Sequence, residues 1–468
     1  MKITLKNVGT LKEAVIEPAR LTVFCGGNNT GKTYAMYVVW ALLQRRIHHA
    51  FAVAERMAED IKVSGSAVYP LHAFIKQNWA TLEKGIAEGL RKRLPDLFSA
   101  PPTMFEPADI RLDLGSDALI QWLEKNAGDF RRSISLGGEG SLDVRLTSGP
   151  DGLGMAWTAV NLNKSPTSLL AEIISSLLIE LSLVSALPGK AFLLPAERGG
   201  LNLFYPDLDA KNSALVRHLK RDDSNPFELM KDLMVAQYAE PIDAYIQFLK
   251  RVPRIPKNGS DYHDQALQLQ KDITRVRYKV SKDGVITAKP YRSETELGIH
   301  LTSSTVKSFY GLWAWLELQA HPGDCLMIDE PELNLHPDNQ RLIARLLVRL
   351  VNRGIRVVVS THSDYIVREL NNMTMLASDF PERVDVEKRF DYDAEGAERL
   401  QPQDVVAYNF TDKIVRKVEV SREFGIEVES MDAAINRLNE SNSAIYFALQ
   451  DALHPVTTPD SVKAEEDA

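Results

Sequence analysis

The sequence has 468 residues, of which 44% are hydrophobic and 25% charged, and these values exclude a wholly disordered, collagen-like or disulfide-scaffold protein. With 55 basic and 63 acidic residues the net charge is -8, so any contact with nucleic acid must use a local patch or a partner. The two cysteines, Cys25 and Cys325, are too few for a disulfide framework and fit a reducing cytosol, so we expect a cytoplasmic protein.

Residues 1–50 show the pattern strand, turn, strand, loop and helix. The segment 21–25 is a short apolar strand, and the apolar residues after the loop recur at helical spacing. The loop between them, 26–33, reads GGNNTGKT and matches the phosphate-binding pattern G-x-x-x-x-G-K-[ST] at every fixed position. A chance glycine turn is the alternative, but the position between a strand and a helix is the one that phosphate binding requires.

Each part of this loop has an expected role in binding ATP with Mg²⁺. The glycines let backbone N–H groups surround the β-phosphate, and the helix N-terminus adds its partial positive charge. Lys32 is expected to reach the β- and γ-phosphates, and the hydroxyl of Thr33 to ligate Mg²⁺. The expected nucleotide contacts are Gly26, Asn28, Asn29, Thr30, Gly31, Lys32 and Thr33.

The middle of the chain separates this loop from the next motifs. Residues 51–190 are predicted to be an inserted, mainly helical region with short strands, and 191–300 a strand followed by helical and linker segments that include a hairpin at 276–287. The most apolar long run, 169–187, contains glutamates and serines. We therefore predict a buried helix there rather than a membrane span, and no membrane partner.

Residues 301–375 are predicted to form helix, strand, helix and strand, the second part of the same lobe. The apolar strand 325–328 ends in Asp329 and Glu330, and carboxylates at the ends of parallel strands lie at the sheet edge where ligands bind. Asp329 is expected to hold Mg²⁺, and Glu330 to polarise the attacking water. A solvated strand end is the alternative, which a preceding phosphate-binding loop disfavours.

A third apolar strand, 357–359, leads into His362. The distance in sequence from Glu330 is enough for one helix and a crossover to a parallel strand. His362 is therefore expected at the same sheet edge, where it can position the γ-phosphate and the water. As a lone residue it would more often be a buried, satisfied histidine.

Leu301 to Thr305 read LTSST and precede an amphipathic helix. The simple interpretation is that a serine caps the helix. A helix N-terminus with free hydroxyls is also a phosphate site, so Ser303 and Ser304 are candidates for both roles.

The remaining segments carry weaker patterns. Residues 376–455 are predicted to be a C-terminal α+β segment, and 456–468 a disordered acidic tail. A basic stretch at 250–257 and further basic residues at 271–279 could contact DNA, but a solvated loop and strand face explain them equally well.

Together these motifs resemble the ABC-type ATPase heads of the SMC and OLD kind. The resemblance rests on GGNNTGKT, LTSST, LMIDEPELNLHP and VVVSTHS, and covers roughly the first 45 residues and 295–370. It implies an α/β P-loop NTPase with an ABC-type head, in which helices wrap a mixed sheet. No glutamine follows the phosphate-binding loop where the family usually has one, and the Glu197-Arg198 region is the candidate replacement.

The resemblance also implies an assembly. In that family two heads bind head to tail, and each ATP touches the phosphate-binding loop of one subunit and the signature serines of the other. Ser303 and Ser304 would take that role here, although both signature glycines are replaced by serine and Thr305 stands in place of glutamine. A homodimer is expected at least, and a larger ring built from dimers is open.

Two cellular roles follow from the resemblance. The chain is similar to stand-alone ATPase subunits of two-gene anti-phage systems of the PARIS and Septu types, where the ATPase is a sensor or scaffold for a separately encoded effector, such as a Toprim or HNH nuclease. The alternative is an SMC-like ATPase of DNA repair or maintenance. Repair heads carry long heptad arms, and the prolines, glycines and strand patterns of 51–300 argue against such arms.

Overall fold

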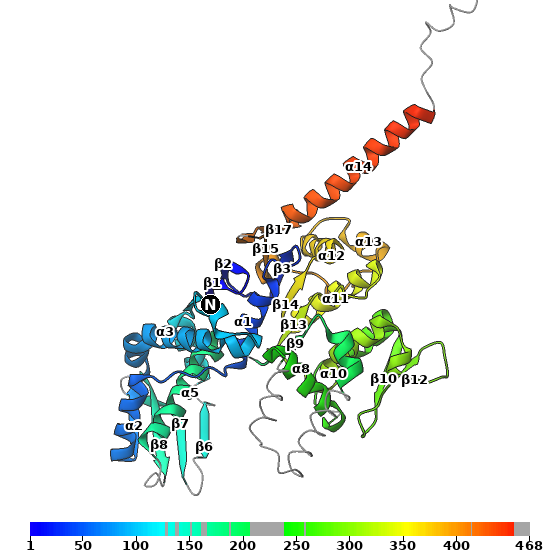
Figure 1. The fold of residues 1–468 in the computed structure, drawn as a ribbon. Coiled ribbons are helices and arrows are strands. Elements are labelled where there is room, and N and C mark those ends of the chain that lie inside the picture. Colours follow the sequence, from blue (N-terminus) through cyan, green and yellow to red (C-terminus); the bar gives the residue numbers. More distant parts are fainter. Residues whose placement is uncertain are drawn as a thin grey trace, which may run out of the picture. The chain divides into compact units, whose positions relative to one another are not determined.

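The computed structural model describes residues 1–126, 130–135, 140–149, 152–160, 166–186, 189–205, 238–256, 259–412 and 414–453 (Figure 1). The chain divides into two compact units, Met1–Ile426 and Glu427–Ala468. The predicted acidic tail, 456–468, lies outside the described residues.

The first unit is built on a six-stranded sheet in the order β16-β15-β3-β14-β13-β9 (Figure 1). Its strands are β3 Leu21–Gly26, β9 Ala191–Leu194, β13 Cys325–Asp329, β14 Arg356–Thr361, β15 Val405–Phe410 and β16 Val415–Val418. The five strands from β15 to β9 are parallel, and only β16 is antiparallel. The central strands are buried on both faces, which explains their continuous apolar runs. This is the predicted α/β fold with a mixed sheet.

Helices pack around this sheet. They include α1 Lys32–Gln44, α10 Ser304–Leu318, α11 Pro337–Asn352, α12 Asp364–Met375 and α13 Arg383–Arg389. In α11, proline takes the first helical position, where its missing N–H costs no hydrogen bond, and His336 is the N-cap. Helix α1 contacts β3, β9, β13 and β14, so the residues of the phosphate-binding loop are fixed to the centre of the sheet.

A second, antiparallel sheet has the order β2-β1-β5. Its strands are β1 Lys2–Val8, β2 Leu11–Ile16 and β5 Asp109–Asp113. The register pairs Ile3 with Leu112 and Leu5 with Ile110. The region predicted as an insertion therefore supplies a strand to the N-terminal sheet, and its core is continuous with that of the first 50 residues.

The rest of the 51–190 region is mainly helical. It contains α2 Ala52–Ser64, α3 Leu71–Phe98, η1 Pro102–Phe105, α4 Ser116–Lys125, α5 Thr167–Ala186, and a sheet of order β4-β8-β7-β6 formed by Ser66–Pro70, Gly152–Val160, Ser141–Gly149 and Arg131–Ser135. Helix α5 is long and apolar enough to cross a membrane by length and composition, and 56% of its Thr167–Val184 window is buried. It packs against α2, and its Ser175 hydroxyl accepts a hydrogen bond from the Phe51 N–H at 3.3 Å.

Between β9 and α10 the chain forms shorter elements. They are α8 Glu240–Arg251, η3 Val252–Arg254, α9 His263–Gln268, the π-helix η4 Leu269–Thr274, β10 Val276–Val280, β11 Ile286–Pro290, β12 Leu297–Gly298 and η5 Ile299–Leu301. Strands β10 and β11 pair antiparallel with Gly284 in the turn at φ 83°, as the hairpin prediction required.

The C-terminal segment is less separate than its predicted boundaries suggest. Strand β15 lies beside β3 in the main sheet, and Tyr408 in β15 accepts a hydrogen bond from the Glu17 N–H at 2.7 Å. The remaining elements of this segment are η6 Pro402–Asp404, β17 Val420–Ser421 and β18 Gly425–Ile426. Among the described residues, the second unit is formed by α14 Glu429–Leu453, inside the segment predicted to be α+β.

Candidate nucleotide-binding site

The phosphate-binding loop leaves the sheet at Gly26 and ends where α1 begins. Gly26, Asn29 and Gly31 have φ of 140°, 62° and 96°, values that suit glycine and are tolerated by asparagine. A Cβ atom on Gly26 would lie 2.2 Å from the carbonyl oxygen of Phe410 in β15. The neighbouring strand therefore requires glycine at this point.

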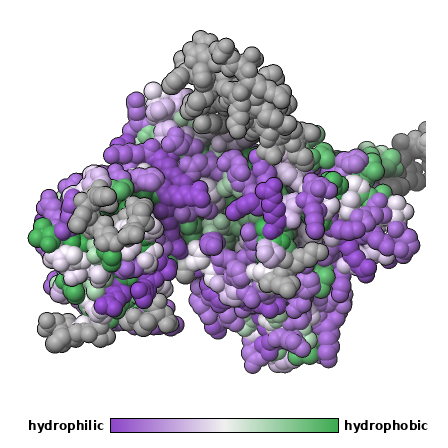
Figure 2. Space-filling view, turned by 90° about the horizontal axis from the view of Figure 1, so that it is seen from below, coloured by the Kyte–Doolittle hydropathy of each residue, from purple (hydrophilic) through white to green (hydrophobic). Residues whose placement is uncertain are grey.

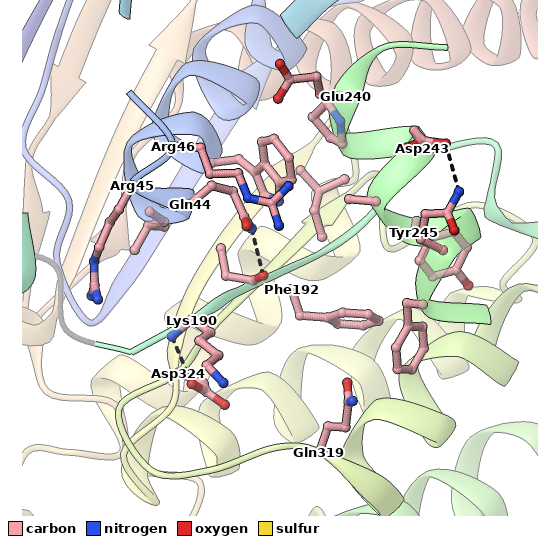
Figure 3. A pocket seen from close by; sticks show the side chains of 18 of the residues that line it. Gln44, Arg45, Arg46, Lys190, Phe192, Glu240, Asp243, Tyr245, Gln319 and Asp324 are labelled. Carbon is pink, nitrogen blue, oxygen red and sulfur yellow. Dashed lines mark hydrogen bonds between the residues drawn. The ribbon is translucent and has the colours of Figure 1, made fainter. Parts of the chain in front are cut away.

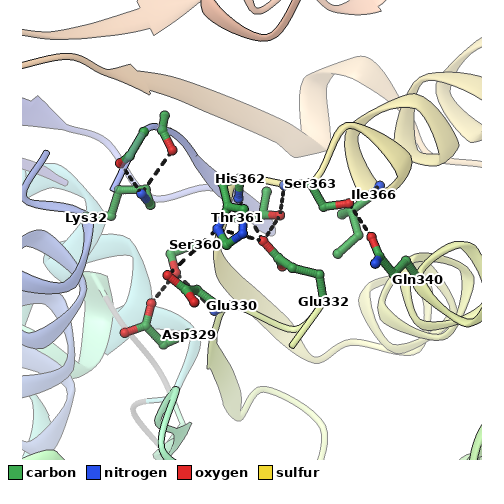
Figure 4. A network of polar contacts seen from close by, with 12 residues as sticks. Lys32, Asp329, Glu330, Glu332, Gln340, Ser360, Thr361, His362, Ser363 and Ile366 are labelled. Carbon is green, nitrogen blue, oxygen red and sulfur yellow. Dashed lines mark hydrogen bonds and ion pairs between the residues drawn. The ribbon is translucent and has the colours of Figure 1, made fainter. Parts of the chain in front are cut away.

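Lys32 is turned back into its own loop (Figure 4). Its Nζ donates hydrogen bonds to the carbonyl oxygens of Gly26 at 3.0 Å and Gly27 at 2.6 Å. The residue is 5% exposed, and burial lowers the pKa of its ammonium group. Thr30 also closes the loop, since its hydroxyl donates to Gly27 at 2.9 Å. The ammonium group of Lys32 therefore lies inside the loop, where the oxygens of a phosphate can replace the two carbonyls as its acceptors.

The two predicted Mg²⁺ ligands meet across the sheet edge. The Thr33 hydroxyl donates a hydrogen bond to Asp329 Oδ2 at 3.0 Å. The parallel register sets Asp329 beside Ser360, whose hydroxyl donates to Asp329 Oδ1. Hydroxyl and carboxylate oxygens are the hard ligands that Mg²⁺ takes, usually with waters and phosphate oxygens completing the shell. The residues present therefore fit this ion.

Glu330 occupies a strained position at the end of β13. Its φ is 50°, and a left-handed conformation costs a non-glycine residue about 1–2 kcal/mol. Its N–H donates to Ser360, to the carbonyl at 3.1 Å and the hydroxyl at 3.2 Å. These hydrogen bonds stabilise the turn at Glu330. Because of this turn, the Glu330 side chain points in a different direction from that of the preceding, buried Asp329.

His362 lies beside Glu330, with Nδ1 3.8 Å from Glu330 Oε1. Burial raises the pKa of the Glu330 carboxyl, and the nearby His362 partly offsets that rise. The His362 side chain is 42% exposed, so the structure does not match the alternative of a buried, satisfied histidine.

Glu332, which the motif analysis assigned no role, and Arg198, which it considered only as part of a replacement for the family's glutamine, complete the network. Glu332 Oε1 accepts hydrogen bonds at 2.8 Å from the Thr361 hydroxyl and the His362 N–H, and lies 3.3 Å from His362 Nδ1. Arg198, fully buried, donates to the carbonyls of Asp329 at 2.7 Å and Glu330 at 2.8 Å. Arg198 acts on backbone carbonyls, and Glu332 on one backbone N–H and two side chains, all brought together only in the folded sheet.

The two residues considered as a replacement for the family's glutamine, Glu197 and Arg198, lie in different environments. Arg198 is buried under the strand end, with its guanidinium 5.6 Å from the ring centre of Phe309, while Glu197 is exposed. Burial lowers the pKa of Arg198. Arg198 is a positioning residue for the Asp329–Glu330 turn rather than a nucleotide contact.

Ser303 and Ser304 lie at the exposed N-terminus of α10. Ser303 is the N-cap, and its hydroxyl accepts a hydrogen bond from the Val306 N–H at 3.3 Å. Thr305 donates to the Asn334 carbonyl at 2.7 Å, and Asn334 donates to Ser308 at 3.1 Å. Among the residues that the structure describes, this helix start is therefore tied to the loop after Glu330, not to the phosphate-binding loop of the same chain.

A cavity of about 1930 Å³ lies elsewhere, between the end of α1, α3, α8, β9 and α10 (Figure 3). Its lining includes Gln44, Lys190, Phe192 and Asp324, none of them an expected nucleotide contact. Gln44 donates a hydrogen bond to the Ala191 carbonyl at 3.2 Å across one wall of the cavity.

The face of the molecule in Figure 2 is mainly hydrophilic, with small scattered hydrophobic areas.

Residues 201–368 match a family described as AAA domain, putative AbiEii toxin, Type IV TA system. The match covers roughly a third of the chain and contains the LTSST, Asp329–Glu330 and His362 motifs, while the phosphate-binding loop precedes it. The chain has a P-loop NTPase fold. The sheet order and the common edge on which Lys32, Asp329 and His362 lie carry this assignment.

Solved structures of SMC heads are similar to the chain over most of its length. The Smc head domain with an extended coiled coil from Pyrococcus furiosus, bound to the C-terminal domain of ScpA, is 13% identical, with 94% of this chain and 98% of that chain covered and a TM-score of 0.34. The SMC head domain from Thermotoga maritima is 11% identical, with 90% and 98% covered and a TM-score of 0.32. No protein of curated function matches the sequence.

Proposed function

We propose that the chain is a Mg²⁺-dependent ATP hydrolase whose active site is completed by a second copy. The observation that carries this proposal is the hydrogen bond between Thr33 and Asp329, which joins the phosphate-binding loop to the acidic strand end beside Glu330. Lys32 exchanges its two loop carbonyls for phosphate oxygens when ATP enters. Thr33 and Asp329 would hold the metal ion, which would supply positive charge to neutralise the phosphates.

Glu330 is the residue that we propose as the general base. It must be ionised to take a proton from water, yet burial disfavours its charged form. His362 favours the ionised form and can donate a hydrogen bond toward the same carboxylate or the γ-phosphate. Glu332 holds the backbone of His362 and so positions the pair.

The second copy supplies the signature face. Ser303 and Ser304 are exposed at a helix N-terminus, where hydroxyls and N–H groups favour an anion. Their link to the loop after Glu330 couples that face to the catalytic turn. A two-fold pair then has two reciprocal sites, each with one phosphate-binding loop and one serine pair.

In the cell we propose the role of a sensor or scaffold that holds a separately encoded effector for anti-phage defence. Support comes from the family resemblance and from the matched family description, which names a putative toxin of a toxin–antitoxin system. The effector would be a Toprim or HNH nuclease from a neighbouring gene, and both proteins would be cytoplasmic. Copurification of the two gene products and loss of phage protection in Lys32→Ala would support this role, whereas protection by the variant would oppose it.

The alternative role, a DNA-maintenance ATPase, has less support than the defence role. On β10 and β11, Lys279 is paired with Glu296 at 3.4 Å and Lys289 with Glu294 at 2.6 Å, and Arg277 covers the ring of Tyr291. These contacts neutralise or cover part of the basic surface that DNA would need.

The direct test is ATP binding and hydrolysis by the purified chain with Mg²⁺. Lys32→Ala is expected to weaken ATP binding by at least about tenfold, because an ammonium–phosphate contact is charge-assisted. Lys282→Ala, in the exposed β10–β11 turn, is the matched control and should bind ATP normally. Normal affinity in Lys32→Ala would refute the phosphate-binding role.

A further inference from the structure

Helix α14 carries a row of exposed apolar side chains. Leu438, Ile445, Leu449 and Leu453 are 68%, 66%, 53% and 61% exposed, in a helix that forms the second unit of the chain (Figure 1). Soluble surfaces rarely leave so many large apolar groups in one contiguous area without a partner.

Three members of this row, Leu438, Ile445 and Leu449, lie on a coiled-coil seam, and Leu453 flanks it. Leu438, Asn442, Ile445, Leu449 and Ala452 follow one another at intervals of four, three, four and three residues. This is the a/d pattern of a heptad repeat, with Leu438 and Ile445 at d, and Asn442 and Leu449 at a. The same spacing continues upstream in the sequence to Ile435 and Met431.

Asn442 identifies the kind of partner. It is the polar member of the seam, and a single asparagine at an a position is characteristic of two-stranded parallel coiled coils, where it faces its own copy. An apolar partner surface would leave the amide buried without a hydrogen bond, which is unfavourable. A second copy of the helix satisfies both amides.

Charge supports the same partner and argues against a lipid surface. The helix has four acidic residues and one basic residue, whereas helices that lie on membranes are rich in lysine and arginine. The positions that flank the seam, at 439, 441, 446 and 448, are Asn, Ser, Tyr and Ala. Two copies therefore bring no like charges face to face along this stretch.

The area is sufficient for a specific contact. The four exposed seam and flanking aliphatic side chains, with Tyr446 at 55% exposure, offer roughly 500 Å² per helix. A pair would bury about 1,000 Å², near the lower limit for a biological interface. We propose that α14 pairs in parallel with α14 of a second copy, as a nucleotide-independent interface.

The test is disulfide cross-linking of full-length Ala452→Cys in a Lys32→Ala background without nucleotide, so that it does not depend on the proposed ATPase contact. The native Cys25 and Cys325 are buried and do not interfere. In a parallel pair the two introduced thiols face each other, and most chains should become disulfide-linked dimers. Ser443→Cys, outside the seam, should cross-link at least about tenfold more slowly.

Two further substitutions, each combined with Ala452→Cys, distinguish pairing through the seam from nonspecific association of apolar side chains. Ile445→Glu should slow the cross-linking of Ala452→Cys at least about tenfold, because it buries two carboxylates in the seam. Phe447→Glu, at an equally apolar position that is 63% exposed and off the seam, should leave the rate unchanged. A monomeric Ala452→Cys chain, equal cross-linking of Ser443→Cys, or equal loss in both glutamate variants would overturn the proposal. The first result would also be expected if an effector or a membrane were the natural partner.

Discussion

Two adjacent carboxylates have different environments, and we propose different roles for them. Asp329 is 4% exposed and accepts hydrogen bonds from Thr33 and Ser360, which fix its carboxylate beside the Thr33 hydroxyl. Glu330 accepts no such bonds among the described contacts, and burial raises its pKa. The left-handed turn at Glu330 separates the two side chains, so that one faces the metal position and the other faces His362.

The variant Glu330→Gln tests the proposed role of Glu330 as the general base. It keeps the shape of the side chain and removes the proton acceptor, so ATP should bind normally while hydrolysis falls about 10²- to 10⁴-fold. Binding by equilibrium dialysis and single-turnover hydrolysis measure the two effects separately. Hydrolysis at the wild-type rate would mean that Glu330 has another task.

The acid limb of the pH–rate profile tests His362. As the proposed general base Glu330 must be ionised, so we expect ATP hydrolysis to be lost as pH falls through the raised pKa of this carboxyl. His362→Ala removes a group that lowers that pKa, so the limb should move to higher pH. His321→Ala, a similarly exposed histidine paired with Asp261, should leave the limb in place. An unshifted limb in His362→Ala would contradict the coupling.

The sequence predicted the residues of the candidate site better than it predicted the residues that hold them in position. Lys32, Thr33, Asp329 and Glu330 belong to local motifs whose spacing follows from the chemistry of phosphates. Arg198, Glu332 and Ser360 act through hydrogen bonds to strand ends that come together only in the folded sheet. A pattern within one segment does not contain that information.

At the scale of elements, the parallel strands were predictable one by one and their order was not. Strands β3, β13 and β14 are apolar runs with motifs at their ends, but β15 and β5 have no such mark. Both pair with strands far away in the sequence, β15 with β3 and β5 with β1. The carbonyl of Phe410 in β15 then accounts for Gly26, which the motif alone explains only by phosphate binding.

Arg198 connects two elements, and its removal should be costly. Arg198→Met leaves the carbonyls of Asp329 and Glu330 without these donors, at about 1–3 kcal/mol for each unsatisfied group. We expect a lower midpoint of thermal unfolding together with slower ATP hydrolysis. Arg254→Met, at an exposed position in η3, should change neither quantity. Full activity and stability in Arg198→Met would show that the turn holds itself.

At the scale of the whole molecule, one chain provides two unlike functional faces. One is the sheet edge with Lys32, Asp329 and Glu330, and the other is the exposed start of α10 with Ser303 and Ser304. Because the two faces differ, copies can close a two-fold pair only by reciprocal contact. We propose that hydrolysis needs both faces, from two different chains.

Mixing two inactive variants measures this most directly. Lys32→Ala lacks the phosphate-binding lysine, and Ser304→Arg blocks the opposing serine face, so each should be inactive alone. A mixed pair contains one site with an intact Lys32 and an intact opposing Ser304. Because equal mixing makes half of all pairs mixed, ATP hydrolysis should recover to roughly a quarter of the wild-type rate. Activity that stays absent, although labelled subunits are shown to exchange, would contradict the shared site.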